Sequence, residues 1–213
     1  MKNLYSLVLF SLIFSQFGLA QIESKEKNKE YTDLKKALLE PELVVRLNLS
    51  NQNIDLENQN FLVFKNLEYL NLKNDHLKSI PESISMLSKL KVLDLSGNDF
   101  IELSDDFYKL TNLEELYLNE EKNINLPKTL GLLGKLPNLR SLHLENDNLN
   151  SLPAEIKNLQ NLEFLYLNQN SFKEIPKEVK GLDHLQYLDL KYNKIAPTIQ
   201  TPENINFGFK ISL

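Results

Sequence analysis

The stretch Leu90-Lys-Val-Leu93-Asp-Leu95 decides the fold of this chain, because its pattern returns along the sequence at a fixed spacing. Copies of the pattern, the last of them weaker, begin at these residues: Leu67, Leu113, Leu139, Leu162, Leu185 and Val44. The period is 23 residues, with one longer unit of 26 residues between Leu113 and Leu139. A repeated period of roughly 20–50 residues is the signature of architectures built by stacking similar units. Seven such units span residues 44–195.

Each unit combines a strand signal with a turn signal. Leu93 and Leu95 alternate with a polar residue, which is the period of a strand whose leucines share one face. Stacked units would place these strands about 4.8 Å apart in a parallel sheet. The second half of several units carries an apolar residue before proline, as in Ile80-Pro81, Leu152-Pro153 and Ile175-Pro176. Proline lacks an N–H and has a fixed φ, so this half predicts turns or short helical segments on the opposite side.

This combination resembles the leucine-rich-repeat family, whose unit reads L-x-x-L-x-L-x-x-N-x-L followed by an I/L-P turn. The resemblance covers residues 44–195 and has the form seen in exported bacterial repeat proteins. It implies an α/β fold: a right-handed, horseshoe-shaped solenoid with a parallel β-sheet on its concave face and a helical cap at its N-terminus. It also implies that partners bind on the concave face.

The family's asparagine position is where this chain departs most from the pattern. Along the seven units that position holds Gln52, Asp75, Asn98, Glu121, Asp147, Asn170 and Asn193. An asparagine amide both accepts and donates hydrogen bonds, whereas an ionised carboxylate only accepts them. We therefore expect an incomplete hydrogen-bond ladder at Asp75 and Asp147, with Glu121 in the unit of unusual length.

The first twenty residues have the layout of a secretory signal peptide. Lys2 gives a positive start, residues 7–14 are apolar except for one serine, and Gly18-Leu19-Ala20 places small residues before a cut at Gln21. A membrane anchor is the alternative, but a spanning helix needs about 20 apolar residues and polar residues interrupt this stretch early. We expect residues 1–20 to be removed, leaving a secreted, periplasmic or cell-surface protein without a membrane span.

The segments that flank the repeats have distinct patterns. Residues 21–31 are charged and lack apolar spacing, so we expect a flexible tether. Residues 32–43 hold one short amphipathic helix that ends before Pro41, and we assign it as the N-terminal cap, because the first unit needs a cover. Residues 196–213 end in an alternating strand pattern of Phe207, Phe209, Ile211 and Leu213. We interpret this end as a C-terminal cap or flap; a sorting or docking segment is the alternative.

Composition argues against most catalytic and metal-binding classes. The chain has no cysteine, which removes disulfides, thiolate zinc sites and cysteine nucleophiles. The three histidines, His76, His143 and His184, lie in different units and at different repeat positions. No nucleophile elbow, phosphate-binding glycine loop or paired-histidine metal motif occurs. We expect no enzymatic activity, no cofactor and no metal site. The net charge of −5 disfavours a nucleic-acid partner.

The candidate binding site lies on the concave face, where residues at equal positions of successive units form columns. Tyr117, His143 and Tyr166 fall in one column, with Phe164 and Tyr187 in the column beside it. We add Asp189 to this site, together with Glu145 and Lys191, which we expect as charges at its rim. Solvent-facing rings have two explanations: cross-strand stacking for stability, at roughly 0.2–1 kcal/mol per pair, or a binding hot spot, in which tyrosine is enriched.

From these patterns we predict a monomeric, non-enzymatic scaffold that binds a protein or peptide ligand. The alternative is a structural or adhesive envelope component whose rings stack on glycan. The acidic group Glu114, Glu115, Glu120 and Glu121 in the long unit is interpreted as a solvated surface. A patch for a basic partner and a calcium site are the alternatives there.

Export gives the first testable prediction. Intact-mass measurement of the protein from its native cell should show a chain that begins at or near Gln21, because the cleavage pattern precedes that residue. A mature protein that still carried Met1 to Ala20 would contradict the signal-peptide interpretation.

Overall fold

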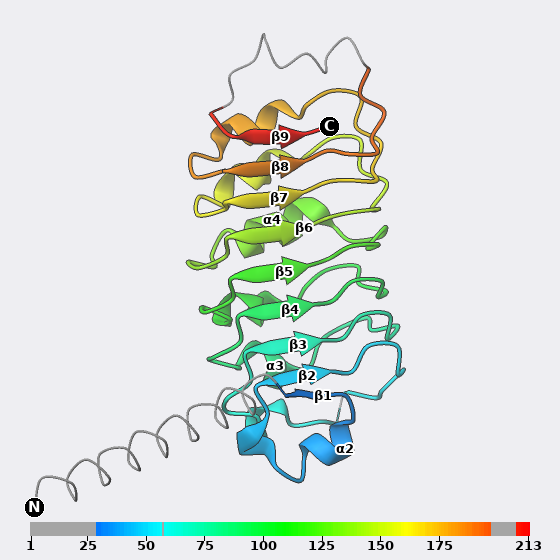
Figure 1. Cartoon of the computed structure of the whole chain (residues 1–213), viewed down its shortest axis with the longest axis vertical. Coiled ribbons are helices and arrows are strands. Elements are labelled where there is room, and N and C mark those ends of the chain that lie inside the picture. Colours follow the sequence, from blue (N-terminus) through cyan, green and yellow to red (C-terminus); the bar gives the residue numbers. More distant parts are fainter. Residues whose placement is uncertain (1–28, 57, 197–207) are drawn as a thin grey trace, which may run out of the picture.

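One nine-stranded sheet organises the whole molecule. The computed structural model describes residues 29–56, 58–196 and 208–213. The strands follow one another in chain order from β1 to β9, and every neighbouring pair is parallel (Figure 1). Their bounds are Glu30–Tyr31 (β1), Arg46–Asn48 (β2), Tyr69–Asn71 (β3), Val92–Asp94 (β4), Glu115–Tyr117 (β5), Ser141–His143 (β6), Phe164–Tyr166 (β7), Tyr187–Asp189 (β8) and Lys210–Ser212 (β9).

The predicted repeat register is confirmed, including the passage through the 26-residue unit. Each strand from β2 to β8 places one leucine inward with no exposed area, so that these residues form a row: Leu47, Leu70, Leu93, Leu116, Leu142, Leu165 and Leu188. Across the long unit, Leu116 still pairs with Leu142 and Tyr117 with His143. The extra residues therefore leave the strands aligned.

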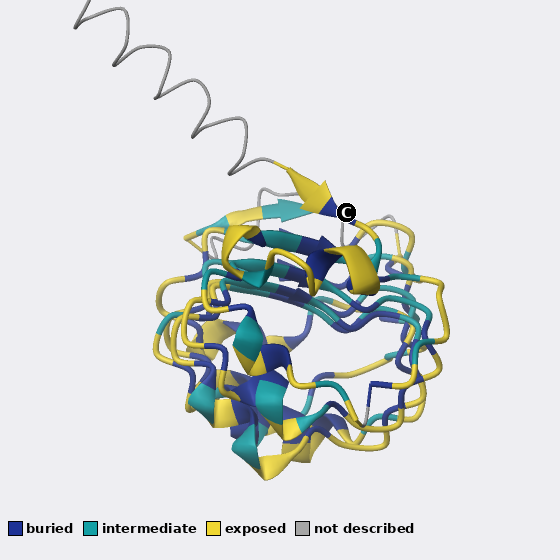
Figure 2. Ribbon diagram, turned by 90° about the horizontal axis from the view of Figure 1, so that it is seen from below, coloured by how far each residue is buried: buried dark blue, intermediate teal, exposed yellow. Residues whose placement is uncertain are grey.

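Short helical segments form the side of the solenoid opposite the sheet. Figure 2 shows them facing the strands, with buried residues lining the interior between the two layers. Their bounds are Phe61–Val63 (η2), Glu82–Ser85 (α3), Asp105–Lys109 (η3), Leu126–Leu133 (α4), Ala154–Asn158 (η4) and Lys177–Gly181 (η5). The longest of them, α4, belongs to the 26-residue unit and takes up its extra length on this side.

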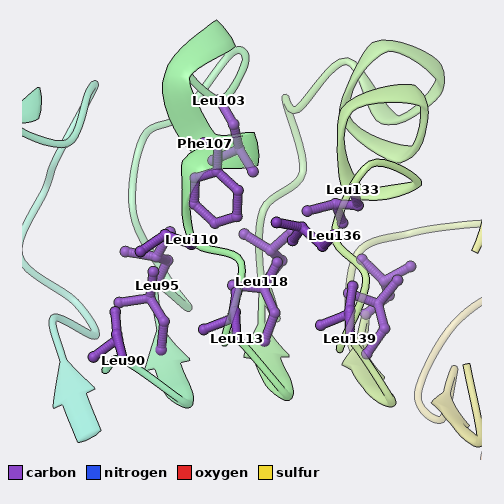
Figure 3. Close-up of a cluster of buried hydrophobic side chains, with 14 of the residues drawn as sticks. Leu90, Leu95, Leu103, Phe107, Leu110, Leu113, Leu118, Leu133, Leu136 and Leu139 are labelled. Atoms are coloured by element: carbon purple, nitrogen blue, oxygen red, sulfur yellow. The ribbon is translucent and has the colours of Figure 1, made fainter. Parts of the chain in front are cut away.

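The core is a continuous layer shared between neighbouring units. In Figure 3, Leu103 and Phe107 point from the η3 side toward the leucines of the strands, and Phe107 has no exposed area. Burying one leucine side chain stabilises a fold by roughly 1.5–3 kcal/mol. A single unit cannot enclose its own leucines, so this stabilisation requires a neighbour on each side.

Both ends of the described solenoid carry additional strands. At the N-terminal end, β1 pairs with β2, and the short helices Leu34–Ala37 (α2) and Pro41–Leu43 (η1) follow it. The sequence assigned residues 30 and 31 to a tether, whereas Tyr31 is buried and paired with Leu47, so the tether prediction is wrong for these two residues. Residues 1–28, and with them the predicted signal peptide, lie outside the described residues.

At the C-terminal end, β9 pairs with β8 and adds the last strand of the sheet. Phe209 and Ile211 pack against the core, as a cap requires. Within the described ranges, none of the helices has the length and apolar character needed to cross a membrane.

Asparagines at the family position link one unit to the next. The Asn98 side chain is buried, and its Oδ1 accepts from the backbone N–H of Asp75 at 3.1 Å. Its Nδ2 donates to the carbonyls of Leu72, at 2.9 Å, and Leu95, at 2.7 Å, which directly follow the successive strands β3 and β4. Asn170 makes the same kind of bridge. An amide is suited to this position because it satisfies donors and acceptors of the buried backbone together.

Three acidic residues occupy the same buried position, where they accept hydrogen bonds but, when ionised, cannot donate the bonds that asparagine donates. Asp147 Oδ1 accepts from the backbone N–H of Glu121 at 2.7 Å, and Glu121 Oε1 accepts from that of Asn98 at 2.6 Å. The second oxygens of Asp75, Glu121 and Asp147 are buried without a hydrogen-bond partner in the described part of the chain. Burial raises the pKa of Asp75, and it raises the pKa of Glu121 and of Asp147 to about 7. A protonated carboxyl would restore the missing donor.

This ladder predicts that stability depends on pH. The pKa of Asp147 rises on folding from 3.8 to about 7, so the folded state favours the protonated acid. Its contribution is complete below about pH 4 and is lost as the pH rises through about 7. Asp147→Asn supplies a donor at every pH, so we expect it to raise the free energy of unfolding by about 1–3 kcal/mol at pH 8.

Urea titrations at pH 5 and pH 8 measure this difference. The gain from Asp147→Asn should be clearly larger at pH 8. The control is Asp183→Asn, because Asp183 is exposed and the substitution should change stability little at either pH. An equal gain at both pH values, or a loss at pH 8, would show that Asp147 is not a strained member of the ladder.

Candidate functional site

The repeat register builds the candidate site on the solvent-facing side of the sheet, which we call the concave face. The last residues of strands β2 to β8 stand side by side in one column: Asn48, Asn71, Asp94, Tyr117, His143, Tyr166 and Asp189. Short side chains occupy both ends of this column and large rings its middle. The predicted alignment of Tyr117, His143 and Tyr166 is therefore confirmed.

The three rings form a continuous stack, which we call the ring stack. The Tyr117 and His143 centroids lie 3.8 Å apart with an angle of 18° between the planes. The His143 and Tyr166 centroids lie 4.2 Å apart with an angle of 8°. Parallel strands are about 4.8 Å apart, so rings at equal positions are held near stacking distance. The stack therefore stabilises the sheet, and both tyrosines remain partly exposed.

His143 differs from the sequence-based expectation, which placed it at the solvent-facing surface. Only 7% of the residue is exposed, because a tyrosine covers each face of its ring. Its Nε2 lies 3.0 Å from Glu115 Oε1, and its Nδ1 lies 3.4 Å from Glu145 Oε2. Burial alone would lower the pKa of His143, but the contacts with Glu115 and Glu145 outweigh it and raise the pKa above 6.5. His143 thus organises the site from within.

Glu115 also belongs to the candidate site, and sequence reasoning missed it because it was counted with the solvated acidic group. Its Oε1 accepts a hydrogen bond from the Tyr117 hydroxyl at 2.7 Å and also contacts His143. The bond to His143 is the main cause that lowers the pKa of Glu115. Burial and the bond to Glu115 raise the pKa of Tyr117, so its hydroxyl stays neutral. The signal was present in the register, since residues 115 and 117 share one face of β5.

The remaining predicted site residues surround the ring stack at different depths. Phe164 pairs with Tyr187 across β7 and β8, and both are partly exposed. The Tyr187 hydroxyl donates to Asp189 at 3.3 Å, and the Tyr187 ring lies 5.7 Å from that of Tyr166 at 58°.

The two charged residues that we expected at the rim differ in their exposure. Lys191 is exposed, as expected, whereas the side chain of Glu145 is only 19% exposed and faces His143. Glu145 is therefore a support of the ring stack and not a rim charge.

The arrangement offers recognition groups more than reactive ones. Tyrosine edges, hydroxyls and carboxylates line the surface over β4 to β8. Among the described residues, no group of three or more histidines, cysteines or carboxylates is placed to hold a metal ion. Within the acidic group, Glu114 and Glu120 are exposed, but Glu121 is only 2% exposed and belongs to the ladder, so its assignment to a solvated surface is wrong.

Comparison with known families agrees with this fold. The leucine rich repeat family matches residues 65–123, and the leucine-rich repeat region family matches residues 128–205. Nine parallel strands in one sheet and a convex side of short helices are the architecture of that family. The chain is a leucine-rich-repeat protein.

Solved structures show the same solenoid. A leucine-rich-repeat protein of Leptospira interrogans is 32% identical, with a TM-score of 0.60 over 79% of this chain and 48% of that chain. A chain of the TLR13–ssRNA13 complex is 27% identical, with a TM-score of 0.65 over 80% of this chain and 27% of that chain. A chain of the Toll–Spatzle complex of Drosophila is 21% identical, with a TM-score of 0.56 over 63% and 18% of the two chains, and it supports the fold alone.

The lengths of these relatives differ from that of the present chain. It spans less than half of the Leptospira protein and smaller shares of the chains from the TLR13–ssRNA13 and Toll–Spatzle complexes. No curated protein sequence matches it significantly. The family and the fold are those of binding scaffolds.

Proposed function

We propose that this protein is a non-enzymatic scaffold that binds a protein or peptide through the ring stack and the residues beside it. The observation that carries the proposal is the position of Tyr117 and Tyr166, large rings that remain partly exposed at the centre of the concave face. Tyrosine combines apolar area with a polar tip and dominates binding hot spots. The Tyr166 hydroxyl has no hydrogen-bond partner among the described residues, so it is available to a ligand.

The same rings support a protein ligand better than a glycan. Sugars bind on the faces of aromatic rings, but the two faces of His143 and one face each of Tyr117 and Tyr166 are already covered within the stack. What remains is the outer face of Tyr117 together with ring edges, hydroxyls and carboxylates, which suit the mixed apolar and polar surface of a protein.

A nucleic acid is the second candidate, since the TLR13 chain was solved with an RNA. The charges on the concave face disfavour it for this protein. Asp94, Glu114, Glu115 and Asp189 lie on or beside the strands around the ring stack, and they would repel a phosphate backbone. The protein-ligand proposal is therefore preferred, and the nucleic acid becomes an outcome of the test.

Export belongs to the same proposal. Its support is the pattern of Lys2, the apolar stretch and Gly18-Leu19-Ala20. A scaffold exported in this way would meet its partner outside the cytoplasm, so capture should use extracellular or envelope material.

The test is affinity capture with the chain that begins at Gln21, followed by affinity measurement on variants. The double variant Tyr117→Ala/Tyr166→Ala removes two rings that face solvent in part. Loss of a hot-spot ring costs about 2 kcal/mol or more, so we expect the captured protein to bind at least about 30-fold more weakly. Circular dichroism and a urea titration should show that the solenoid remains folded.

Controls on the convex side separate specific loss from a general effect. Tyr108→Ala removes a ring of the same size from η3, and Lys128→Ala removes a charge from α4. Both variants should bind as the wild type does. A folded double variant with unchanged affinity would overturn the proposal, and a captured ligand that is released by nuclease but not by protease would favour the nucleic-acid candidate.

A further inference from the structure

The ring stack ends abruptly at β5, which leaves one ring face open. His143 covers one face of Tyr117, and the other face is directed toward β4, where the register partner is Asp94. In the described part of the chain, no other ring and no cation stacks on Tyr117. Tyr117 and Asp94 therefore form a step between a tall and a short side chain, which we call the ledge.

The carboxylate of Asp94 has room for another partner. Asp94 Oδ1 accepts from the backbone N–H of Ser96 at 2.9 Å. Within the described residues, its second oxygen has no hydrogen bond and makes no ion pair. The two lysines of neighbouring strands are engaged elsewhere, Lys91 with Glu68 at 3.1 Å and Lys73 with Glu120 at 4.0 Å. The negative charge at the ledge is thus left to solvent or to a ligand.

The same face of the sheet shows that a guanidinium can stack on one of its tyrosines. The guanidinium carbon of Arg46 lies over the Tyr69 ring, 3.9 Å from its centroid, and comes from the strand that precedes the tyrosine. Arg46 also pairs with Glu30 at 3.4 Å. Carboxylate, guanidinium and ring follow one another there across β1, β2 and β3, whereas the ledge takes its carboxylate and its ring from the adjacent strands β4 and β5.

We propose that the ledge formed by Tyr117 and Asp94 binds an arginine side chain of the protein partner. The inference rests on the proposed function of the concave face and names the chemistry that this part of it recognises. A planar guanidinium stacks on the open ring face as a further layer of the stack and pairs with the Asp94 carboxylate. Glu115, whose Oε1 accepts a hydrogen bond from the Tyr117 hydroxyl, adds a second carboxylate beside the same ring.

Other occupants satisfy the ledge less well. A partner aromatic ring would cover Tyr117 but would bring no charge for Asp94. Lysine carries the charge on a compact, strongly hydrated group without the planar fork that stacks on a ring. A nucleobase could stack, but its phosphates would face Asp94, Glu114 and Glu115.

The test uses a defined probe, the peptide acetyl-Gly-Gly-Arg-Gly-Gly-amide, added to the chain that begins at Gln21. Amide and tyrosine-ring NMR signals report where the probe binds. We expect saturable shifts centred on Tyr117, Asp94 and Ser96. The same peptide with citrulline keeps the planar shape but has no charge, and it should bind about three- to tenfold more weakly.

The chain offers a matched set of variants. In Asp94→Asn the bond to the backbone N–H of Ser96 can persist, because Asn48 and Asn71 make the same bond in their own units. This variant and Tyr117→Leu should lose the arginine preference. Asp183→Asn removes an exposed carboxylate that lies outside the concave column, and it should retain this preference.

Each outcome decides the proposal. Saturable binding that prefers arginine to citrulline, is lost in Asp94→Asn and survives in Asp183→Asn supports it. Absence of saturable shifts, equal binding of the citrulline peptide, or equal loss in Asp183→Asn overturns it. If the Tyr117→Ala/Tyr166→Ala variant loses the captured partner while Asp94→Asn binds it as tightly as the wild type, the scaffold function stands and the arginine proposal fails. If the wild type binds arginine specifically at the ledge while the double variant captures the partner undiminished, the ledge stands as an arginine site and the proposed scaffold function fails.

Discussion

The burial of the inward leucines is the constraint on which the rest of the structure depends. A three-residue strand has one inward leucine and cannot enclose it, so each unit is stable only in register between two neighbours. That register fixes the outer residues as firmly as the inner ones, because side chains alternate between the two faces of a strand. Tyr117, His143 and Tyr166 meet on the concave face for the same reason that Leu116, Leu142 and Leu165 meet in the core.

Two unusual chemical features of the protein arise where an ionisable residue occupies a repeat position. In the buried ladder, Asp147 occupies an amide position and leaves an oxygen without a partner. On the concave face, His143 is held between two rings and two carboxylates, which together favour its protonated form. Both features lie in or next to the 26-residue unit, where α4 takes up the additional length.

Periodicity made the fold, the strand register and the ring column predictable from the sequence. The burial of individual side chains was not predictable, because a position in a column determines which way a side chain points but not which neighbours cover it. His143 was expected at the surface and is buried by its neighbours, and Glu145 was expected at the rim and faces His143. Glu115 was interpreted as one of four solvated acidic residues, although it accepts a hydrogen bond from the Tyr117 hydroxyl. Tyr31 was assigned to the tether but pairs at the edge of the sheet. The sequence did not reveal this strand, because two residues are too few to show an alternating pattern.

The proposed binding site requires that the three rings form one continuous stack on the concave face. Nuclear Overhauser spectroscopy on the chain that begins at Gln21 tests this requirement most directly, because ring protons at stacking distance give strong cross-peaks. The imidazole protons of His143 should show cross-peaks to the rings of both Tyr117 and Tyr166, whose centroids lie 3.8 and 4.2 Å away. Absence of cross-peaks to either tyrosine, in a protein whose leucine core is otherwise intact, would contradict the account.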